Sequence, residues 1–90
     1  MLVVTDAAKA KLRETLLANT DNREEGLRLK VKAPGRIGLV IDKQLPDDSI
    51  IEHEGLKLLI VEQAISELLS KATLDVKYSS EGEKLTLFQE

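Results

Sequence analysis

The sequence predicts an α+β domain with antiparallel or mixed β-sheets of about seven short strands and two helices. Segments in which apolar residues occupy every second position recur along the chain, as expected for half-buried strands. Two other segments have apolar residues at helical spacing. Turn residues join most of the strands directly, which argues against a doubly wound parallel sheet, in which helices connect the strands. We therefore expect the order β-α-β-β-β-β-α-β-β in a single domain, 1–90.

The N-terminal segment predicts a short strand at Leu2 to Val4 and then a helix at Asp6 to Ala18. The hydroxyl of Thr5 is suited to cap this helix, and the carboxylate of Asp6 interacts favourably with the positive end of the helix dipole. Apolar residues follow at helical spacing, at Ala8, Leu12 and Leu16. The polar segment 19–26 is expected to be a loop.

Two strands joined by a short loop are expected next, at Leu27 to Ala33 and Ile37 to Asp42. The Pro-Gly pair between them is typical of a turn. In the first strand the apolar side chains define one face, so we expect the opposite face to lie in water. The residues of that opposite face are Arg28, Lys30 and Lys32.

A hairpin follows, in which strands at Ile50 to His53 and Leu56 to Val61 flank the turn Glu54-Gly55. Glycine favours such a turn because it tolerates positive φ angles. The preceding segment, Leu45 to Ser49, is a turn by composition.

The last third predicts a second helix at Glu62 to Lys71 and strands at Leu74 to Tyr78 and Glu83 to Phe88. The helix carries one apolar stripe, which we expect to face the core because small domains need every such stripe. The stripe consists of Ile65, Leu68, Leu69 and Ala72. On the first of the two strands, one face is expected to carry Leu74, Val76 and Tyr78.

Composition limits the chemistry of the chain. The sequence contains no cysteine, which excludes disulfides, thiolate catalysis and thiolate-held metal centres for this chain. Its formal net charge of -3 gives no long-range attraction to nucleic acid or to an anionic membrane. We find neither a secretory signal nor an apolar run near the ~20 residues that span a bilayer. We therefore expect a cytoplasmic protein with no cofactor and no membrane contact.

Several short motifs follow one another along nearly the whole chain. They are a Thr-x-x-Ala-x-x-x-Leu helix start at Thr5, the strand GLRLKVK at 26–32, a Gly-x-x-Gly loop, the turn PDDS, the hairpin EHEGLKLLI at 52–60, ATLD at 72–75 and GEKLTLF at 82–88. Together these motifs resemble the HesB/IscA family of A-type iron-sulfur carrier proteins. The resemblance implies the fold of these bacterial proteins and a place in iron-sulfur cluster assembly or sulfur metabolism.

The resemblance also shows where the chain departs from the family. Such proteins hold iron or a cluster through three cysteines, one in a Gly-Gly-Cys-Ser-Gly loop and two in a C-terminal Cys-Gly-Cys motif. Here Gly35 and Gly38 retain the glycine features of the loop, but Arg36 occupies the position of the cysteine. We expect the C-terminal pair to be absent, because the sequence stops at Glu90. A guanidinium has donors and a positive charge but no acceptor, so it cannot replace a thiolate. The resemblance therefore implies a cysteine-free, degenerate member.

The basic residues give a first alternative, an anion-binding or nucleic-acid-binding strip. KH modules clamp a nucleic-acid backbone with a Gly-x-x-Gly loop, but that loop joins two helices, whereas strands flank it here. No aromatic residue is interleaved to stack bases. A solvated sheet face is the simpler interpretation, and nucleic acid is not an expected partner. The candidate strip consists of Arg28, Lys30, Lys32 and Arg36.

His53, the one histidine, gives a second alternative, a mononuclear iron or zinc site with Glu52 and Glu54. Adjacent strand residues point to opposite faces, so these side chains do not converge on one ion without help from elsewhere. We therefore expect an ordinary polar hairpin end and no metal.

No combination of acid, base and nucleophile indicates an enzyme. Asp47 and Asp48 form a turn first and a carboxylate pair only as a distant alternative. The leading hypothesis is thus a non-enzymatic protein that acts through a protein partner, as an accessory, scaffold or regulatory relative of the iron-sulfur or sulfur-transfer machinery. Monomer and dimer remain equally open.

Overall fold

The computed structural model describes residues 2–33, 36–80 and 82–89. Within these residues the predicted order β-α-β-β-β-β-α-β-β and the α+β class are confirmed. The elements are β1 (Val3–Val4), α1 (Asp6–Asn19), β2 (Glu25–Ala33), β3 (Arg36–Lys43), β4 (Ser49–His53), β5 (Leu56–Val61), α2 (Gln63–Leu68), β6 (Ala72–Ser79) and β7 (Gly82–Gln89).

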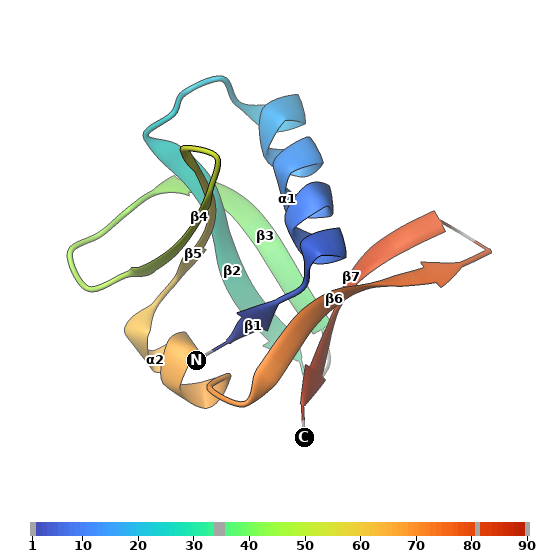
Figure 1. Ribbon diagram of the computed structural model, residues 1–90. Coiled ribbons are helices and arrows are strands. Elements are labelled where there is room, and N and C mark those ends of the chain that lie inside the picture. Colours follow the sequence, from blue (N-terminus) through green and yellow to red (C-terminus); the bar gives the residue numbers. More distant parts are fainter. Residues whose placement is uncertain (1, 34–35, 81, 90) are drawn as a thin grey trace.

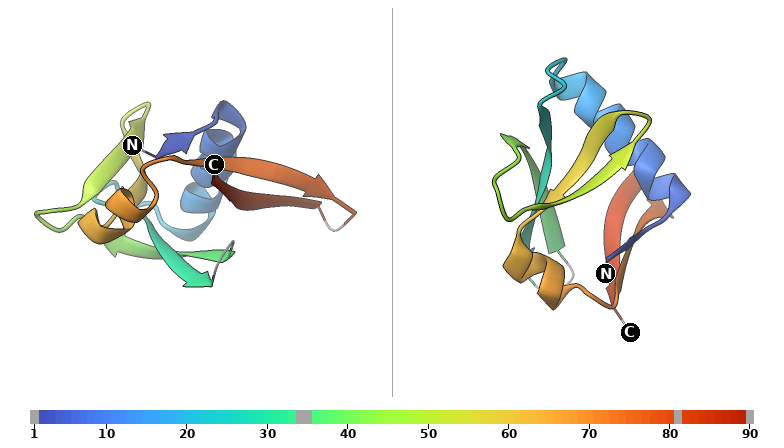
Figure 2. Two further views of the ribbon diagram at one scale, coloured as in Figure 1. Left: turned by 90° about the horizontal axis from the view of Figure 1, so that it is seen from below. Right: turned by 60° about the vertical axis from the view of Figure 1, so that its left-hand side comes forward.

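The strands form two mixed sheets that share one core (Figures 1 and 2). The larger sheet has the strand order β3-β2-β5-β4, and the smaller has the order β1-β6-β7. β2 runs parallel to β5 and β1 runs parallel to β6, while the other pairs are antiparallel. Helix α1 contacts strands of both sheets, so it closes the space between them.

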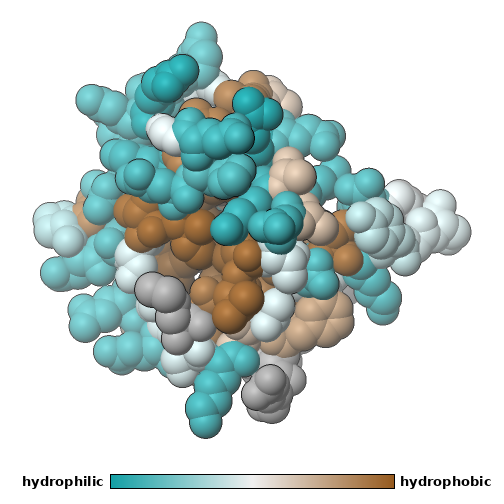
Figure 3. Space-filling model, viewed as in Figure 1, coloured by the Kyte–Doolittle hydropathy of each residue, from teal (hydrophilic) through white to brown (hydrophobic). Residues whose placement is uncertain are grey.

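The core between α1 and the sheets is entirely aliphatic, as the composition predicts. Three α1 residues at helical spacing are buried against alternate residues of β2 and β6. On the face seen in Figure 3, apolar side chains gather in the middle, and hydrophilic side chains surround them. No helix among the described residues has the length and apolar character that crossing a membrane requires.

Helix α1 begins where the sequence predicts. The Thr5 hydroxyl accepts a hydrogen bond from the amide of Ala8 at 3.2 Å, which satisfies one of the free N–H groups of the first turn. The same hydroxyl donates to the carboxylate of Asp75 on β6 at 2.7 Å. The cap therefore also fixes the helix start to the smaller sheet.

The turn between β4 and β5 is the predicted two-residue hairpin turn. Glu54 has φ 51 and Gly55 has φ 80, and two successive positive φ angles match the right-handed twist of the flanking strands. β5 has the predicted bounds, and β1 begins one residue later than predicted. The other strands extend one or two residues further at one or both ends, because their ladders continue past the alternating apolar residues.

The second helix is shorter than predicted, and one core assignment is wrong. α2 spans Gln63–Leu68, and Leu68 is 64% exposed. The helix ends before its apolar stripe completes a second turn, because the turn after Leu69 leads the chain into β6. Leu69 is buried and Ile65 packs against the core, as predicted. Tyr78 is exposed, although it shares a strand face with Leu74 and Val76, because it lies beyond the end of the core.

Candidate functional site

The bend between β2 and β3 is the position where the sequence places the site. Val31 lies opposite Ile37 and Ala33 lies opposite Arg36, with a β-bulge between Val31 and Ala33. Arg36 is the first residue of β3, so it directly follows the bend between two paired strands. The predicted loop residues Pro34 and Gly35 lie outside the described residues.

The described side of this bend is basic. Lys32, at the bulge, is exposed, and its side chain passes over Gly38. A Cβ placed on Gly38 would lie 2.6 Å from Cε and 3.2 Å from Nζ of Lys32. Because glycine has no side chain, Gly38 leaves space that the side chain of Lys32 occupies.

These residues do not fit an iron-sulfur cluster or an iron ion. Lysine ammonium and arginine guanidinium groups are donors without acceptor capacity at neutral pH, and the sequence has no thiol. Among the described residues, no three His, Cys, Asp or Glu side chains are grouped closely enough to hold a metal ion. What the bend offers chemically is positive charge and hydrogen-bond donors.

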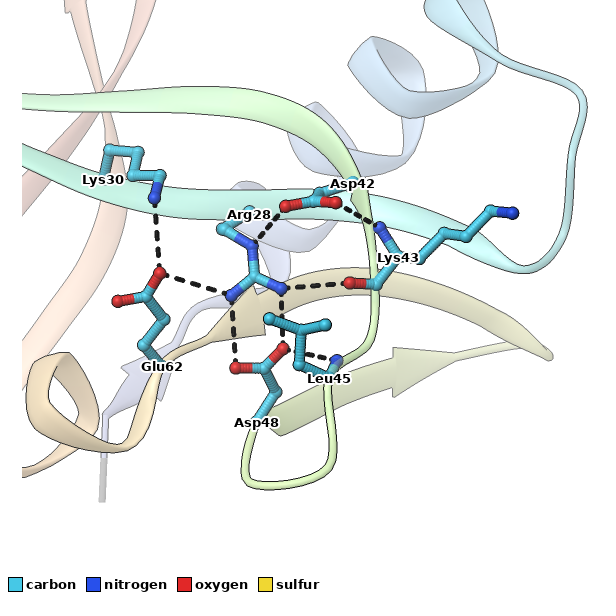
Figure 4. Close-up of polar contacts among 7 residues, drawn as sticks. All are labelled: Arg28, Lys30, Asp42, Lys43, Leu45, Asp48 and Glu62. Atoms are coloured by element: carbon cyan, nitrogen blue, oxygen red, sulfur yellow. Dashed lines mark hydrogen bonds and ion pairs between the residues drawn. The ribbon is translucent and has the colours of Figure 1, made fainter.

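The structure brings together a second polar cluster, centred on Arg28, which the sequence did not indicate (Figure 4). Arg28 is 1% exposed, so the expectation that it faces water with the other basic residues of β2 is wrong. The segment between β3 and β4 supplies Asp48 on the outer side of the larger sheet, where it meets the guanidinium. Arg28 therefore does not belong to an accessible anion-binding strip.

The guanidinium has five interactions for its five N–H donors. Asp48 accepts from Nη1 at 3.1 Å and from Nη2 at 2.6 Å, and Asp42 accepts from Nε at 2.7 Å. Nη2 also donates to the carbonyl of Lys43 at 3.0 Å, and Nη1 lies 3.5 Å from the carboxylate of Glu62. The bidentate pairing of Arg28 with Asp48 fixes both the position and the orientation of the guanidinium.

The cluster also determines how its members ionise. Hydrogen bonds from Arg28 hold the pKa of Asp48 below its ordinary value, against the opposing effect of burial. The amide of Lys43 and then Arg28 lower the pKa of Asp42. Hydrogen bonding to Asp48 raises the pKa of Arg28. All three groups therefore stay charged at neutral pH, and the cluster is a structural ion network rather than a proton donor.

Lys30 is the next member of the predicted strip, and it is partly neutralised. Its ammonium lies 3.2 Å from the carboxylate of Glu62, which also faces Arg28. A strip along β2 is thus reduced to Lys32, with Arg36 following the bend.

His53 lies at the end of β4, with Nε2 3.9 Å from a Glu54 carboxylate oxygen. Glu52 is exposed and lies opposite Lys57 on β5, across a bulge in the ladder. A surface pocket of about 440 Å³ separates this hairpin end from α1. The lining residues that carry charge or an imidazole are Asp6, Lys9, Arg13, His53 and Glu54.

No sequence signal identifies Arg28 as buried, because its alternation matches that of its exposed neighbours. The one hint is the acidic turn PDDS, whose second aspartate is the bidentate partner.

Comparison with known proteins gives one relative and several similar structures. The uncharacterized protein in the nifU 5′ region of Cereibacter sphaeroides is 34% identical over 87 residues, covering 91% of this chain and 80% of the relative. The crystal structure of Escherichia coli SufA, involved in biosynthesis of iron-sulfur clusters, superposes with a TM-score of 0.70 at 25% identity, covering 98% of this chain and 84% of SufA. No family model matches.

Two further structures share the fold at lower identity. IscA with a [2Fe-2S] cluster gives a TM-score of 0.59 at 15% identity, covering 99% of this chain and 82% of IscA. The solution structure of a protein from Aquifex aeolicus gives a TM-score of 0.68 at 21% identity, covering 99% of this chain and 91% of that protein.

Proposed function

We propose that this chain, which belongs to the same family as the Cereibacter sphaeroides protein of the nifU 5′ region and has the HesB/IscA-like fold, acts without a cluster of its own. It is a non-enzymatic accessory, scaffold or regulatory protein of iron-sulfur cluster assembly or sulfur metabolism. It works in the cytoplasm through contact with a protein of that machinery.

The observation that carries this proposal is that the chain has the fold of an iron-sulfur carrier but lacks the cysteine sulfur atoms that ligate iron in such a carrier. The likeness to SufA covers 98% of this chain and 84% of SufA, so most of the scaffold of such a protein is present. The sequence has no cysteine, and Arg36 follows the bend where the family resemblance places one. A protein that keeps this fold but lacks the cluster-ligating cysteines still has the surfaces of the fold, and such surfaces can bind other proteins.

The arrangement at the bend supports exclusion of iron more than its binding. Lys32 brings positive charge to the described side of the bend, and a positive charge repels an iron ion. In this proposal the iron ions and clusters of the pathway are carried by other proteins, and this chain does not hold them.

The two alternative functions have less support among the described residues. An iron or zinc site at His53 and Glu54 needs further ligands, and the described residues hold no group of three His, Cys, Asp or Glu side chains that could form one. An anion site on β2 needs several accessible cations, and Arg28 and Lys30 are engaged by carboxylates. We retain neither as the proposed function.

Affinity capture tests the proposal. The full chain serves as bait in native extract, captured proteins are identified by mass spectrometry, and each purified candidate is titrated against the chain by calorimetry. We expect direct binding to at least one protein that makes, carries or receives iron-sulfur clusters or mobilises sulfur.

An unrelated domain of similar size and net charge is the control bait. The proposal fails if the purified iron-sulfur and sulfur-transfer proteins of the extract show no heat of binding, or if the chain itself turns over a substrate.

A further inference from the structure

A small pocket lies at the C-terminal end of α1, between the helix, the loop that follows it and the start of β5, at the top of Figure 1. This α1-end pocket is lined by residues 16–17, 20–23, 25 and 56. Three of them are leucines: Leu16 is buried, Leu56 is half-buried and Leu17 is 50% exposed.

The size of the α1-end pocket suits one side chain. Its volume is about 180 Å³. Small-molecule sites are larger, at roughly 300 to 1,000 Å³. An apolar cavity of about 150 Å³ is already large enough to bind benzene. The pocket is therefore of a size for a single side chain of another protein rather than for a cofactor.

The loop that forms one wall of the pocket is held by its own hydrogen bonds. The Thr20 hydroxyl donates to the Glu25 carboxylate at 2.7 Å and accepts from the Asn22 amide at 3.1 Å. The side chain of Asn22 accepts from the Glu24 amide at 3.0 Å, and its carbonyl accepts from the Glu25 amide at 3.1 Å. Because these bonds lie within the loop, the wall is formed without a bound partner.

The end of α1 beside the pocket is electrically negative. The helix has no basic residue in its last turn, so no side chain there offsets the negative end of its dipole. The carbonyl of Leu16 accepts a hydrogen bond from the Thr20 amide at 3.0 Å, but the next three carbonyls, 17–19, accept none from the described residues. Both the dipole and the open carbonyls favour a cation at this end.

The charged side chains of the pocket add to this preference. Asp21 and Glu25 are acidic, and Arg23 is the one base of the lining. The α1-end pocket thus combines apolar walls with an excess of negative charge.

Bases elsewhere nearby do not neutralise the pocket. Lys11 and Arg13, earlier in α1, each lie within 4.0 Å of a glutamate carboxylate outside the lining. Lys43 is in register with Glu25 on the neighbouring strand, but no ion pair joins them, and Lys43 lines a separate pocket. The negative charge at the end of α1 is therefore available to a partner.

We propose that the α1-end pocket takes a lysine or arginine side chain of a protein partner. The aliphatic stem packs against the three leucines, and the cationic group meets Asp21 and the open carbonyls of α1. The partner thereby supplies the basic C-terminal residue that α1 lacks. The existence of a protein partner rests on the proposed function, whereas the place and chemistry of docking rest on the pocket.

A capped pentapeptide with one lysine between alanines probes the pocket without knowledge of the partner. Amide chemical shifts of the labelled full chain report where it binds. We expect the shifts to be confined to residues 16–25 and the surroundings of Leu56, and binding to weaken as salt is added.

Two matched peptides separate the stem from the charge. Norleucine in place of lysine keeps the aliphatic stem without the charge, and diaminopropionic acid keeps the charge on a shorter stem. Both should bind more weakly than the lysine peptide, because each loses one of the two contacts that the pocket offers.

Leu17→Lys separates binding from stability. The melting temperature should be unchanged or higher, because a base in the last turn interacts favourably with the helix dipole. Affinity for the lysine peptide should nevertheless fall on the order of tenfold, because the new cation repels the peptide and occupies its place. Leu68→Lys makes the same change at an exposed leucine of α2 and should leave affinity unchanged.

Two charge variants should move the affinity in opposite directions. Asp21→Asn should weaken binding about threefold, which is the effect of losing one exposed ion pair. Arg23→Gln should strengthen binding by a similar factor, because it removes the one base of the lining. A variant that merely damages the fold does not bind more tightly.

The proposal is overturned if the lysine peptide does not bind, if its shifts map to another surface, or if either matched peptide binds as tightly. It is also overturned if Leu17→Lys keeps the full affinity or if Arg23→Gln fails to strengthen binding. Self-association in sedimentation equilibrium that Leu17→Lys abolishes would assign the pocket to a second copy instead. If these tests fail while a purified iron-sulfur protein still binds the chain, only the docking pocket is wrong and the proposed function stands.

Discussion

At the scale of single residues, the buried Arg28 organises the polar side of the larger sheet. It connects β2 to Asp42 on β3, to Asp48 in the following segment and to Glu62 at the start of α2. Among the described residues, no buried side-chain nitrogen or oxygen lacks a hydrogen-bond partner. A satisfied network of this kind fixes the segment between β3 and β4 against the sheet.

Removal of Asp48 should therefore be costly. We expect Asp48→Ala to lower the free energy of unfolding by about 3 kcal/mol, because it leaves a buried guanidinium short of its bidentate partner. Asp47→Ala, next to it but exposed and outside the network, should change that free energy by less than about 0.5 kcal/mol. Urea denaturation of both variants measures the difference, and equal effects would show that the network contributes little.

The same network predicts the response to acid. In the folded chain the pKa values of Asp42 and Asp48 are lowered, so their contribution to stability is complete above the unfolded value of about 3.9. It is lost as the pH falls through that value toward the folded pKa. Unfolding free energy measured against pH should decline in this window, and Asp48→Asn should flatten the decline. A slope unchanged by Asp48→Asn would contradict this assignment.

At the scale of elements, Thr5 joins helix α1 to strand β6. Its hydroxyl caps the helix and donates to Asp75, and this hydrogen bond, followed by the Val76 amide, lowers the pKa of Asp75. We expect Thr5→Ala to cost about 1 kcal/mol of unfolding free energy, whereas Thr5→Ser, which keeps the hydroxyl, should cost much less. Thermal denaturation of the pair tests this, and equal losses would point to the lost methyl group instead.

Two glycines of the larger sheet should respond differently to the same substitution. A Cβ on Gly26 would collide with the backbone carbonyl oxygen of Lys57, and backbone cannot move aside cheaply. A Cβ on Gly38 would meet only the flexible end of Lys32. We therefore expect Gly26→Ala to destabilise the domain by about 2 kcal/mol and Gly38→Ala by less than about 0.5 kcal/mol. Chemical denaturation of both variants measures the two losses in unfolding free energy. A larger loss for Gly38→Ala than for Gly26→Ala would contradict the close approach of Gly26 to the Lys57 carbonyl.

The element order was predictable because its signals are local. Alternation, a threonine cap and a Glu-Gly turn each act within a few residues, and the structure confirms all three. The end of α2 was not predictable, since its exposed Leu68 continues a helical stripe that tertiary structure interrupts. The burial of Arg28 also depends on a distant segment, with Asp48 twenty positions away, so strand alternation placed Arg28 on the outer face but could not predict that this face is covered there.

At the scale of the whole molecule, two sheets and two helices form the architecture shared with SufA. The β6–β7 hairpin extends from the body of the molecule. The sequence predicted Arg36 in the loop between the two strands, whereas Arg36 is the first residue of β3 and directly follows the bend. The exposure of Tyr78 and Phe88 was not predictable, because it depends on where the core ends.

Anaerobic reconstitution tests the central claim most directly. The chain is incubated with iron(II), sulfide and a reductant, desalted, and examined by visible absorption and metal analysis, with IscA, which binds a [2Fe-2S] cluster, as the positive control. Our account predicts a coloured IscA and a colourless chain without bound iron, because no thiol is present to hold a cluster. A stable chromophore that stays with the monomer through desalting would contradict it.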